Sequence, residues 1–413
     1  MTKASKTYLP YAYRLLQVYH ACVVEGGLWL FDPSSKVWLH GREACDRIVT
    51  RLDNSTRRTD RSEIYDLAYN LAPVRGYSDP ALVQVANGVL DARTGELHAP
   101  SADFVVPNVI PWPYDPAAGS DAVKRYLDEV SDGDPETLAQ IEEMLGAAIC
   151  RIRIPYFWVV TSPAGAASTG KSTLGELAIA LVGESNASAL DTHEMGDHFQ
   201  ISCLRQKLLT ASLDTSAAPV PPAALGVLKK IPTQDLLHAD VKNGVPVDFH
   251  PYATVLIVAN RPPAIIRDEG LARRAVTVVL HHHFPESGRE PVRELANDSD
   301  MEALLNHAVT GVQRLLKKGP TMGAASIAAT AAIRQRSSTV LSWLDDAGFD
   351  AAGIEGRTCQ ETYLAYQTWC DAGGERPEAK RDFEDEVQRL IPDLSVEKCR
   401  WQGQPPQHRW VIR

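Results

Sequence analysis

The sequence SPAGAASTGKSTLGEL, residues Ser162–Leu177, contains the strongest motif of the chain. In it, Gly165 is followed after four residues by Gly170, Lys171 and Ser172, which is the G-x-x-x-x-G-K-[ST] spacing of a phosphate-binding loop. An apolar run, FWVVT, precedes it, and a helical pattern of apolar residues that stops at a glycine follows. A buried strand, a glycine-rich loop and a helix are the context that phosphate binding needs, so we predict a nucleotide-binding loop.

Each residue type in this loop has a physical role. Glycines let backbone N–H groups turn toward phosphate oxygens, and the N-terminus of the next helix adds partial positive charge. We expect Lys171 to reach the β- and γ-phosphates of ATP and the Ser172 hydroxyl to ligate Mg²⁺. The residues expected to contact nucleotide are Gly165, Ser168, Thr169, Gly170, Lys171, Ser172 and Thr173. The alternative is a flexible loop that matches the motif by chance.

Three further apolar runs are predicted to be buried strands of the same sheet. They are QKLLTASLD, ATVLIVAN and AVTVVL, at 206–214, 253–260 and 275–280. Because helical patterns alternate with these strands, we expect an α/β fold with a mostly parallel sheet. A long helix is expected to end at Gly319-Pro320.

The two ends of the chain have different patterns. Two β-hairpins are expected at 26–39 and 83–97, and two helices followed by two short strands after residue 358 predict a winged helix. We expect five parts: an N-terminal α+β domain (1–118), a helical collar (119–150), a P-loop ATPase core (151–290), a helical lid (291–335) and a winged-helix domain (336–413).

Polar residues at the ends of the predicted strands are candidate partners of the loop. Asp214 is the candidate acid for metal and water, and Asn260 can touch the γ-phosphate or its attacking water. Arg273 and Arg274 stand ahead of the last strand, where one can act in trans as an arginine finger. The alternatives are a turn aspartate, a capping asparagine and a solvated surface pair.

Between two of these strands, the dipeptide Asn243-Gly244 predicts a tight hairpin. Lys242 lies beside its tip and His238 four residues earlier, so a projecting cation can follow a phosphate backbone. We take Lys242, His238 and Asn243 as candidate DNA contacts, with an ordinary surface hairpin as the alternative. The run His281–His283 is interpreted as a polar strand end, because neighbouring histidines on an extended chain point to opposite sides.

Composition limits the remaining classes. The 413 residues have a net charge of −10 and a pI of about 5.7, so binding of nucleic acid requires a local basic patch. The seven cysteines form no C-x-x-C pair, which fits a reducing cytoplasm and argues against a zinc ribbon. No apolar run reaches the ~18 residues of a membrane span. We expect a cytoplasmic protein of a bacterial host cell.

Taken in order, these segments resemble the superfamily 3 helicases, and more narrowly the C-terminal half of phage and plasmid primase–helicases related to the poxvirus primase–helicase. The resemblance rests on TGKSTL, LKKIPTQD and VANRPPAIIRDEGLARRAVTV, with flanking segments from about residue 60 to the end. It implies an AAA+-like ATPase core in a ring, usually a hexamer, with ATP and Mg²⁺ at the subunit interface. It also implies single-stranded or forked DNA as partner and 3′-to-5′ unwinding.

The resemblance also assigns roles to residues. Lys171 and Ser172 correspond to Walker A, Asp214 to Walker B and Asn260 to sensor 1. Ser172 and Asp214 correspond to the metal ligands. Arg273 or Arg274 corresponds to the arginine finger. The Lys242 hairpin corresponds to the DNA-gripping element.

Two departures from the family pattern leave an alternative open. The family usually has a glutamate in Walker B, where this chain has Leu213, and the approach to the loop is lengthened by TSPA. The alternative is a DNA-binding ring with weak or lost ATPase that serves as a replication-initiation platform. A third is a nucleotide-gated DNA-binding regulator. We expect no primer synthesis by this chain, with a separate primase or origin-binding protein as a further partner.

Overall fold

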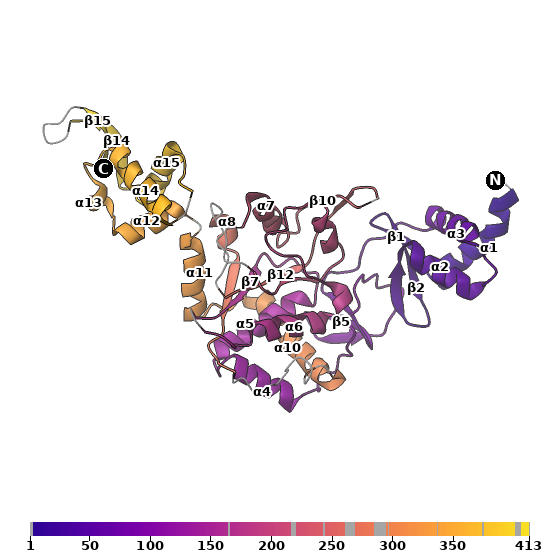
Figure 1. Cartoon of the computed structure of the whole chain (residues 1–413). Coiled ribbons are helices and arrows are strands. Elements are labelled where there is room, and N and C mark those ends of the chain that lie inside the picture. Colours follow the sequence, from indigo (N-terminus) through magenta and orange to yellow (C-terminus); the bar gives the residue numbers. More distant parts are fainter. Residues whose placement is uncertain are drawn as a thin grey trace.

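The computed structural model describes residues 3–163, 166–215, 220–242, 244–260, 269–284, 295, 297–336, 338–373, 376–400 and 406–412. Figure 1 shows a central body built on a sheet, with the N-terminal helices and strands at one end of the molecule and the C-terminal helices at the other. The helix α11 (Ala324–Arg336) leads from the central body to the C-terminal part (Figure 1).

The central sheet has five strands in the order β13-β7-β12-β9-β8, and every neighbouring pair is parallel. The strands are β7 (Phe157–Thr161), β8 (Ala187–Ser188), β9 (Leu209–Ser212), β12 (Thr254–Val258) and β13 (Ala275–Val279). The predicted α/β class and the parallel sheet are confirmed. Almost every residue of these strands is buried, as expected where helices cover both faces.

Alternation along the strands divides the core into two layers. Trp158, Val160 and Val258 belong to the core shared with α5 (Pro135–Ala148), α6 (Lys171–Val182) and α10 (Asp298–Lys318). Phe157, Val159 and their alternating counterparts on β12 pack on the opposite face, against α7 (Pro222–Lys230) and η2 (Gln200–Leu204). The loop after β7 is therefore held at one edge of a sheet covered on both sides.

The backbones of helices α5 and α10 lie close together where the helices cross, because glycines of both helices meet there. A Cβ atom on Gly311 would lie 1.9 Å from the carbonyl oxygen of Glu142, and one on Gly146 would lie 2.3 Å from the backbone nitrogen of Val312. Beside the crossing, Arg314 pairs with the buried Glu142 at 2.6 Å. The crossing combines close backbone contact with a buried ion pair, so it rigidly joins these helices. The helix α4 (Asp121–Val130) packs nearby, capped by Ser120.

The N-terminal unit has α1 (Lys3–Val18), α2 (Gly41–Leu52) and α3 (Arg58–Leu71) beside the sheet β1 (Cys22–Val24), β2 (Gly27–Asp32) and β3 (Val37–His40). A second small sheet follows, with β4 (Leu82–Val85), β5 (Gly88–Asp91) and β6 (Glu96–His98). Both predicted hairpins are present, each extended by a third strand. Val83, Val85 and Leu90 of the second sheet join the core of the central body.

The C-terminal part has its own core. The helices α12 (Thr339–Ala347), α13 (Ala351–Ile354), α14 (Cys359–Gly373) and α15 (Lys380–Leu390) precede the antiparallel pair β14 (Leu394–Cys399) and β15 (Gln407–Ile412). Trp343, Tyr366, Phe383 and Trp410 are buried together there. The expected order of helices followed by a β-hairpin is present.

The hairpin between β9 and β12 differs from its prediction. β10 (Leu237–Ala239) pairs with β11 (Val247–Phe249) in the register Ala239↔Val247, so residues 240–246 connect them. The hairpin is confirmed, but the tight two-residue turn at Asn243-Gly244 is wrong. Pairing stops before Pro246, which has no backbone N–H to donate to the ladder. Asn243 itself lies outside the described residues.

Candidate functional site

The loop after β7 enters α6 through residues with unusual backbone angles. Gly170, which precedes the helix, has φ +82°, and Ser168 has φ +53°. A Cβ atom on Gly170 would lie 2.8 Å from the ring of Phe284, so both the backbone angle and the available space require glycine. Thr169 is buried, whereas Ser172 is exposed and Thr173 half-buried in the first turn of α6. Gly165 lies outside the described residues.

Lys171 is the first residue of α6 and is only 8% exposed. Its Nζ donates hydrogen bonds to Ser162 Oγ at 2.8 Å and to Thr169 Oγ1 at 3.0 Å. Burial lowers the pKa of Lys171, and the two hydroxyls that accept hydrogen bonds from its Nζ are neutral and do not compensate its charge. Among the described residues, the ammonium group at this helix N-terminus therefore donates hydrogen bonds to neutral groups only, which is an arrangement that favours an anion.

Residues after β13 support the outside of this loop. The backbone N–H of Phe284 donates to the carbonyl of Ser168 at 2.8 Å, and His283 Nδ1 lies 3.0 Å from the carbonyl oxygen of Ala167. The sequence suggested only a polar strand end for His281–His283. The structure instead places His283 against the loop, because β13 and β7 are neighbours in the sheet.

Leu213, directly after β9, stands where the resemblance implies a glutamate. Leu213 packs toward α6, where a Cβ atom on Gly175 would lie 2.4 Å from Leu213 Cδ2. Leu213 therefore fills an apolar contact and points no polar group at the site. Asp214 is exposed.

A polar network that the sequence did not reveal joins the ends of three strands. Ser212 Oγ, at the end of β9, donates to Asp191 Oδ2 at 2.8 Å and lies 2.6 Å from Thr215 Oγ1. Thr215 N donates to the carbonyl of Val258 in β12 at 3.1 Å. Asp191 lies three residues beyond β8, and His193 contacts it at 3.2 Å. A carboxylate shortly after a strand is too common in sequences to be singled out without the strand order.

Asn260 and the two arginines lie at opposite edges of the parallel sheet, because Asn260 follows the end of β12 whereas Arg274 directly precedes the start of β13. Asn260 is exposed just beyond β12, next to β7. Arg273 and Arg274 follow the short helix α8 (Glu269–Ala272), and Arg274 Nη1 donates to the carbonyl of Lys229 at 3.1 Å. Arg273 is exposed. Arg274 is thus bound to α7 of its own chain.

Two candidate DNA contacts of the β10–β11 hairpin have different surroundings. His238 Nδ1 lies 2.7 Å from Asp248 Oδ1 across the strand pair, so this ring nitrogen interacts with a neighbouring side chain of the hairpin. Lys242 is exposed in the connection.

No group of three or more His, Cys, Asp or Glu suited to a metal ion occurs among the residues whose positions are described. Ser172 and Asp214 offer hydroxyl and carboxylate oxygens, the ligand types that Mg²⁺ prefers when substrate phosphates complete its shell. Within the described part of the chain, no helix is both long and apolar enough to span a bilayer.

Comparison with known proteins supports this architecture. Residues 20–132 match the family described as D5 N terminal like, and residues 164–274 match a family of unknown function, DUF5906. Three structures of the NrS-1 C-terminal region superpose with TM-scores of 0.53, 0.54 and 0.56 at 15%, 13% and 14% identity. The matches cover 98–100% of this chain and 98–100% of those chains. At this identity the likeness shows a shared fold.

Fold and site thus define an α/β protein with a five-stranded parallel sheet and a lysine-bearing loop at its carboxyl edge. The match of residues 20–132 to the D5 N terminal like family, together with this shared fold, supports the resemblance to phage primase–helicases.

Proposed function

We propose that the protein is an ATP-dependent DNA helicase with a P-loop AAA+-like core, working as a ring on single-stranded DNA during replication of a phage or mobile element. The observation that carries this proposal is Lys171 at the start of α6, which is buried and has no acidic partner among the described residues. Triphosphate oxygens supply the negative charge that compensates this ammonium group. The winged-helix interpretation of the C-terminal part and the hexameric ring belong to the same proposal.

The arrangement assigns steps to residues of this chain. Backbone N–H groups of the loop and the α6 N-terminus bind phosphate oxygens, and Lys171 stabilises charge that develops on the γ-phosphate. Asn260, beyond the adjacent strand β12, orients the attacking water. Arg273 or Arg274 of a neighbouring subunit stabilises the same charge from outside. Ser172 and Asp214 would hold Mg²⁺, which would supply additional neutralisation of the phosphate charge.

Leu213 favours a second candidate function. Because its side chain packs against α6, the residues directly after β9 offer Asp214 without a second acidic neighbour in the chain. A ring that binds nucleotide for assembly and hydrolyses it slowly, serving as a replication-initiation platform, is the alternative. The regulator hypothesis is less favoured, because residues 338–413 carry nine Lys and Arg against fourteen Asp and Glu, and such a charge disfavours a duplex-binding module.

The experiment that decides between these functions is ATP turnover with and without single-stranded DNA, in wild type and in Lys171→Ala. We expect turnover that DNA stimulates and that the variant loses. If wild type binds nucleotide but shows no turnover under either condition, the helicase proposal fails and the platform takes its place. Fork-unwinding assays with 3′ or 5′ tails then measure polarity.

The two aspartates near the end of β9, Asp214 and Asp191, lead to a separate prediction. Asp214→Asn should lower ATP turnover by about 10²-fold or more, because it removes the acid nearest the proposed metal. Asp191→Asn should lower it by roughly tenfold, since Asp191 acts only through Ser212. Nucleotide binding should persist in both, as measured by a fluorescent ATP analogue.

The exposed carboxylate Glu184, placed after α6, provides the control, and Glu184→Gln should leave turnover unchanged. Ser212→Ala combined with Asp191→Asn should cost no more than either change alone, because both break one hydrogen bond. Additive losses would show that Asp191 does not act through Ser212.

A further inference from the structure

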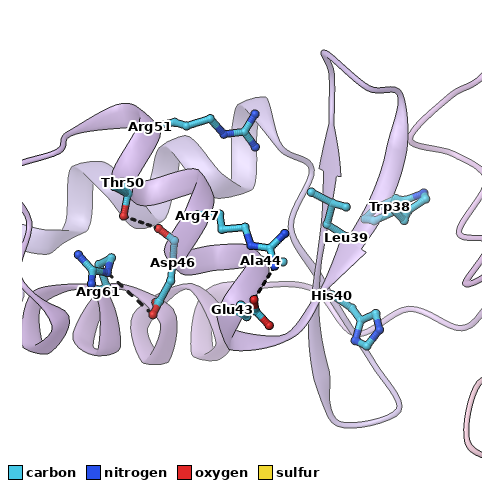
Figure 2. Close-up of a pocket in the computed structure, with 10 residues that line it drawn as sticks. All are labelled: Trp38, Leu39, His40, Glu43, Ala44, Asp46, Arg47, Thr50, Arg51 and Arg61. Carbon is cyan, nitrogen blue, oxygen red and sulfur yellow. Dashed lines mark hydrogen bonds and ion pairs between the residues drawn. The ribbon is translucent and has the colours of Figure 1, made fainter. Parts of the chain in front are cut away.

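A broad hollow lies on the N-terminal unit (Figure 2), which Figure 1 shows at a distance from strand β7. It measures about 870 Å³ and is formed by α2, the end of β3 and one side chain from α3. Figure 2 shows Arg47 and Arg51 on α2 and Arg61 on α3 among its lining side chains. Arg47 and Arg51 are one helical turn apart and share a face of α2.

Charge is distributed unevenly along the chain, and the N-terminal unit carries an excess of positive charge. Residues 1–75 contain eleven Lys and Arg against eight Asp and Glu, a net charge of +3. The remaining residues contain 31 against 44, a net charge of −13. A polyanion that approaches this acidic protein is therefore attracted to the N-terminal unit and repelled elsewhere.

The arginines of the hollow have partners that a stronger anion can replace. Arg47 pairs with Glu43 at 2.5 Å, but the two side chains are 73% and 80% exposed. Arg51 pairs with Asp32 at 3.3 Å and is itself more than half exposed. The Arg47–Glu43 pair, which is exposed on both sides, contributes little and is screened by salt, whereas the Asp32 side chain of the other pair is only 6% exposed. Phosphate oxygens accept the same guanidinium hydrogen bonds in the same forked geometry.

On the inner side of the hollow, hydrogen-bonding capacity is unused. Arg61 Nε lies 3.9 Å from Asp46 Oδ2, too long for a hydrogen bond. Arg61 Nε and Asp46 Oδ1 are buried without a hydrogen-bond partner in the described structure. An unused donor stands beside an unused acceptor, which suits a ligand that carries both phosphate acceptors and base amino donors, as a nucleic-acid strand does.

The rim carries a neutral ring next to a further cation. His40 stacks on Trp29 with 4.6 Å between ring centroids. Burial and the positive charge of Arg205 lower the pKa of His40, so the ring is neutral at pH 7. The attraction of this region therefore comes from arginines, whose charge does not titrate near neutral pH.

We propose that this hollow binds the backbone of a nucleic-acid strand, as a contact separate from the nucleotide site and from the β10–β11 hairpin. The hollow is open to solvent and carries three arginine side chains, in contrast to the enclosed pockets that hold small metabolites. Arg47 and Arg51 contact phosphates, and the Arg61–Asp46 pair opens toward the strand.

The test measures binding of a labelled single-stranded DNA oligonucleotide by fluorescence anisotropy, over a range of salt and without nucleotide. Arg47→Gln with Arg51→Gln should weaken binding by about tenfold near 0.1 M salt and reduce the salt slope by roughly 1.4, or ~0.7 per lost contact. Arg14→Gln with Arg58→Gln removes the same charge from exposed positions outside the hollow and should change binding by less than about twofold. Glu43→Gln should tighten binding, because it frees Arg47 from its competitor.

Equal losses in the two double variants would show a bulk charge effect and overturn the site. An unchanged affinity in Arg47→Gln with Arg51→Gln would overturn it as well. Thermal unfolding of each variant establishes that it folds. Because no nucleotide is present, these outcomes are independent of ATP turnover, so failure of this site and failure of the proposed helicase activity are distinguishable. A duplex of the same sequence shows whether the hollow prefers one strand or two.

Discussion

Lys171→Met should abolish the thermal stabilisation that ATP gives to the wild-type protein. A ligand at one hundred times its Kd stabilises the folded state by about 2.7 kcal/mol, and Lys171 supplies the charge that holds the phosphates. ATP turnover should fall by about 10²-fold or more in the same variant. Differential scanning fluorimetry with and without ATP and Mg²⁺ measures the first effect.

The same substitution should leave the nucleotide-free protein no less stable than wild type. Because the folded-state pKa of Lys171 is lowered, the unfolded chain binds more protons at pH values between the folded and unfolded pKa. The lysine therefore opposes folding at pH 7, and this cost disappears as pH rises through that range. Methionine has no charge to bury, so an activity loss should accompany unchanged or higher stability.

Lys124→Met is the matched control, because Lys124 is an exposed residue of α4. It should keep both the ATP-dependent shift and the turnover of wild type. A normal ATP-dependent shift in Lys171→Met would mean that the loop after β7 does not hold the triphosphate.

Gly311→Ala should destabilise the central body by about 3 kcal/mol or more, the upper end of the range for overpacked cores. The added Cβ would lie 1.9 Å from Glu142 O and 2.6 Å from Glu143 N, and both are backbone atoms of α5 that cannot turn aside. Relief requires separation of α5 from α10, which would also disturb the Arg314–Glu142 ion pair. Urea unfolding followed by far-ultraviolet circular dichroism measures the loss.

Gly226→Ala provides the opposite case within a helix. Gly226 lies in α7 with no atom within 4 Å of the position of a Cβ, so alanine should stabilise the protein by about 0.5–1 kcal/mol. Equal stability of Gly311→Ala and wild type would contradict the close crossing of α5 and α10.

The strand–loop–helix around Lys171 is the part of the site that could be predicted from the sequence. Its chemistry lies in consecutive residues: an apolar run, then Gly170 and Lys171, then a helix that ends at Gly183. Local backbone preferences and hydrophobic periodicity are properties of neighbouring residues, so they can be recognised without the fold. The parallel sheet and the terminal hairpins followed from the same kind of pattern.

Contacts between distant segments could not be predicted in this way. The packing of Leu213 against α6, the Asp191–Ser212 hydrogen bond and the tie from Arg274 to α7 each depend on which strands and helices are neighbours. The tight turn predicted at Asn243-Gly244 failed for a related reason, since the pairing register of β10 and β11 ended the ladder earlier.

By itself, the sequence determined the fold class and the position of the lysine-bearing loop, because both arise from short-range order along the chain. Only the tertiary structure decided which polar groups surround that loop. It also decided that glycines join α5 to α10 and that Arg47, Arg51 and Arg61 line one hollow. These features require side chains from separate elements to meet, and the free energy that brings them together comes from burial of the whole core.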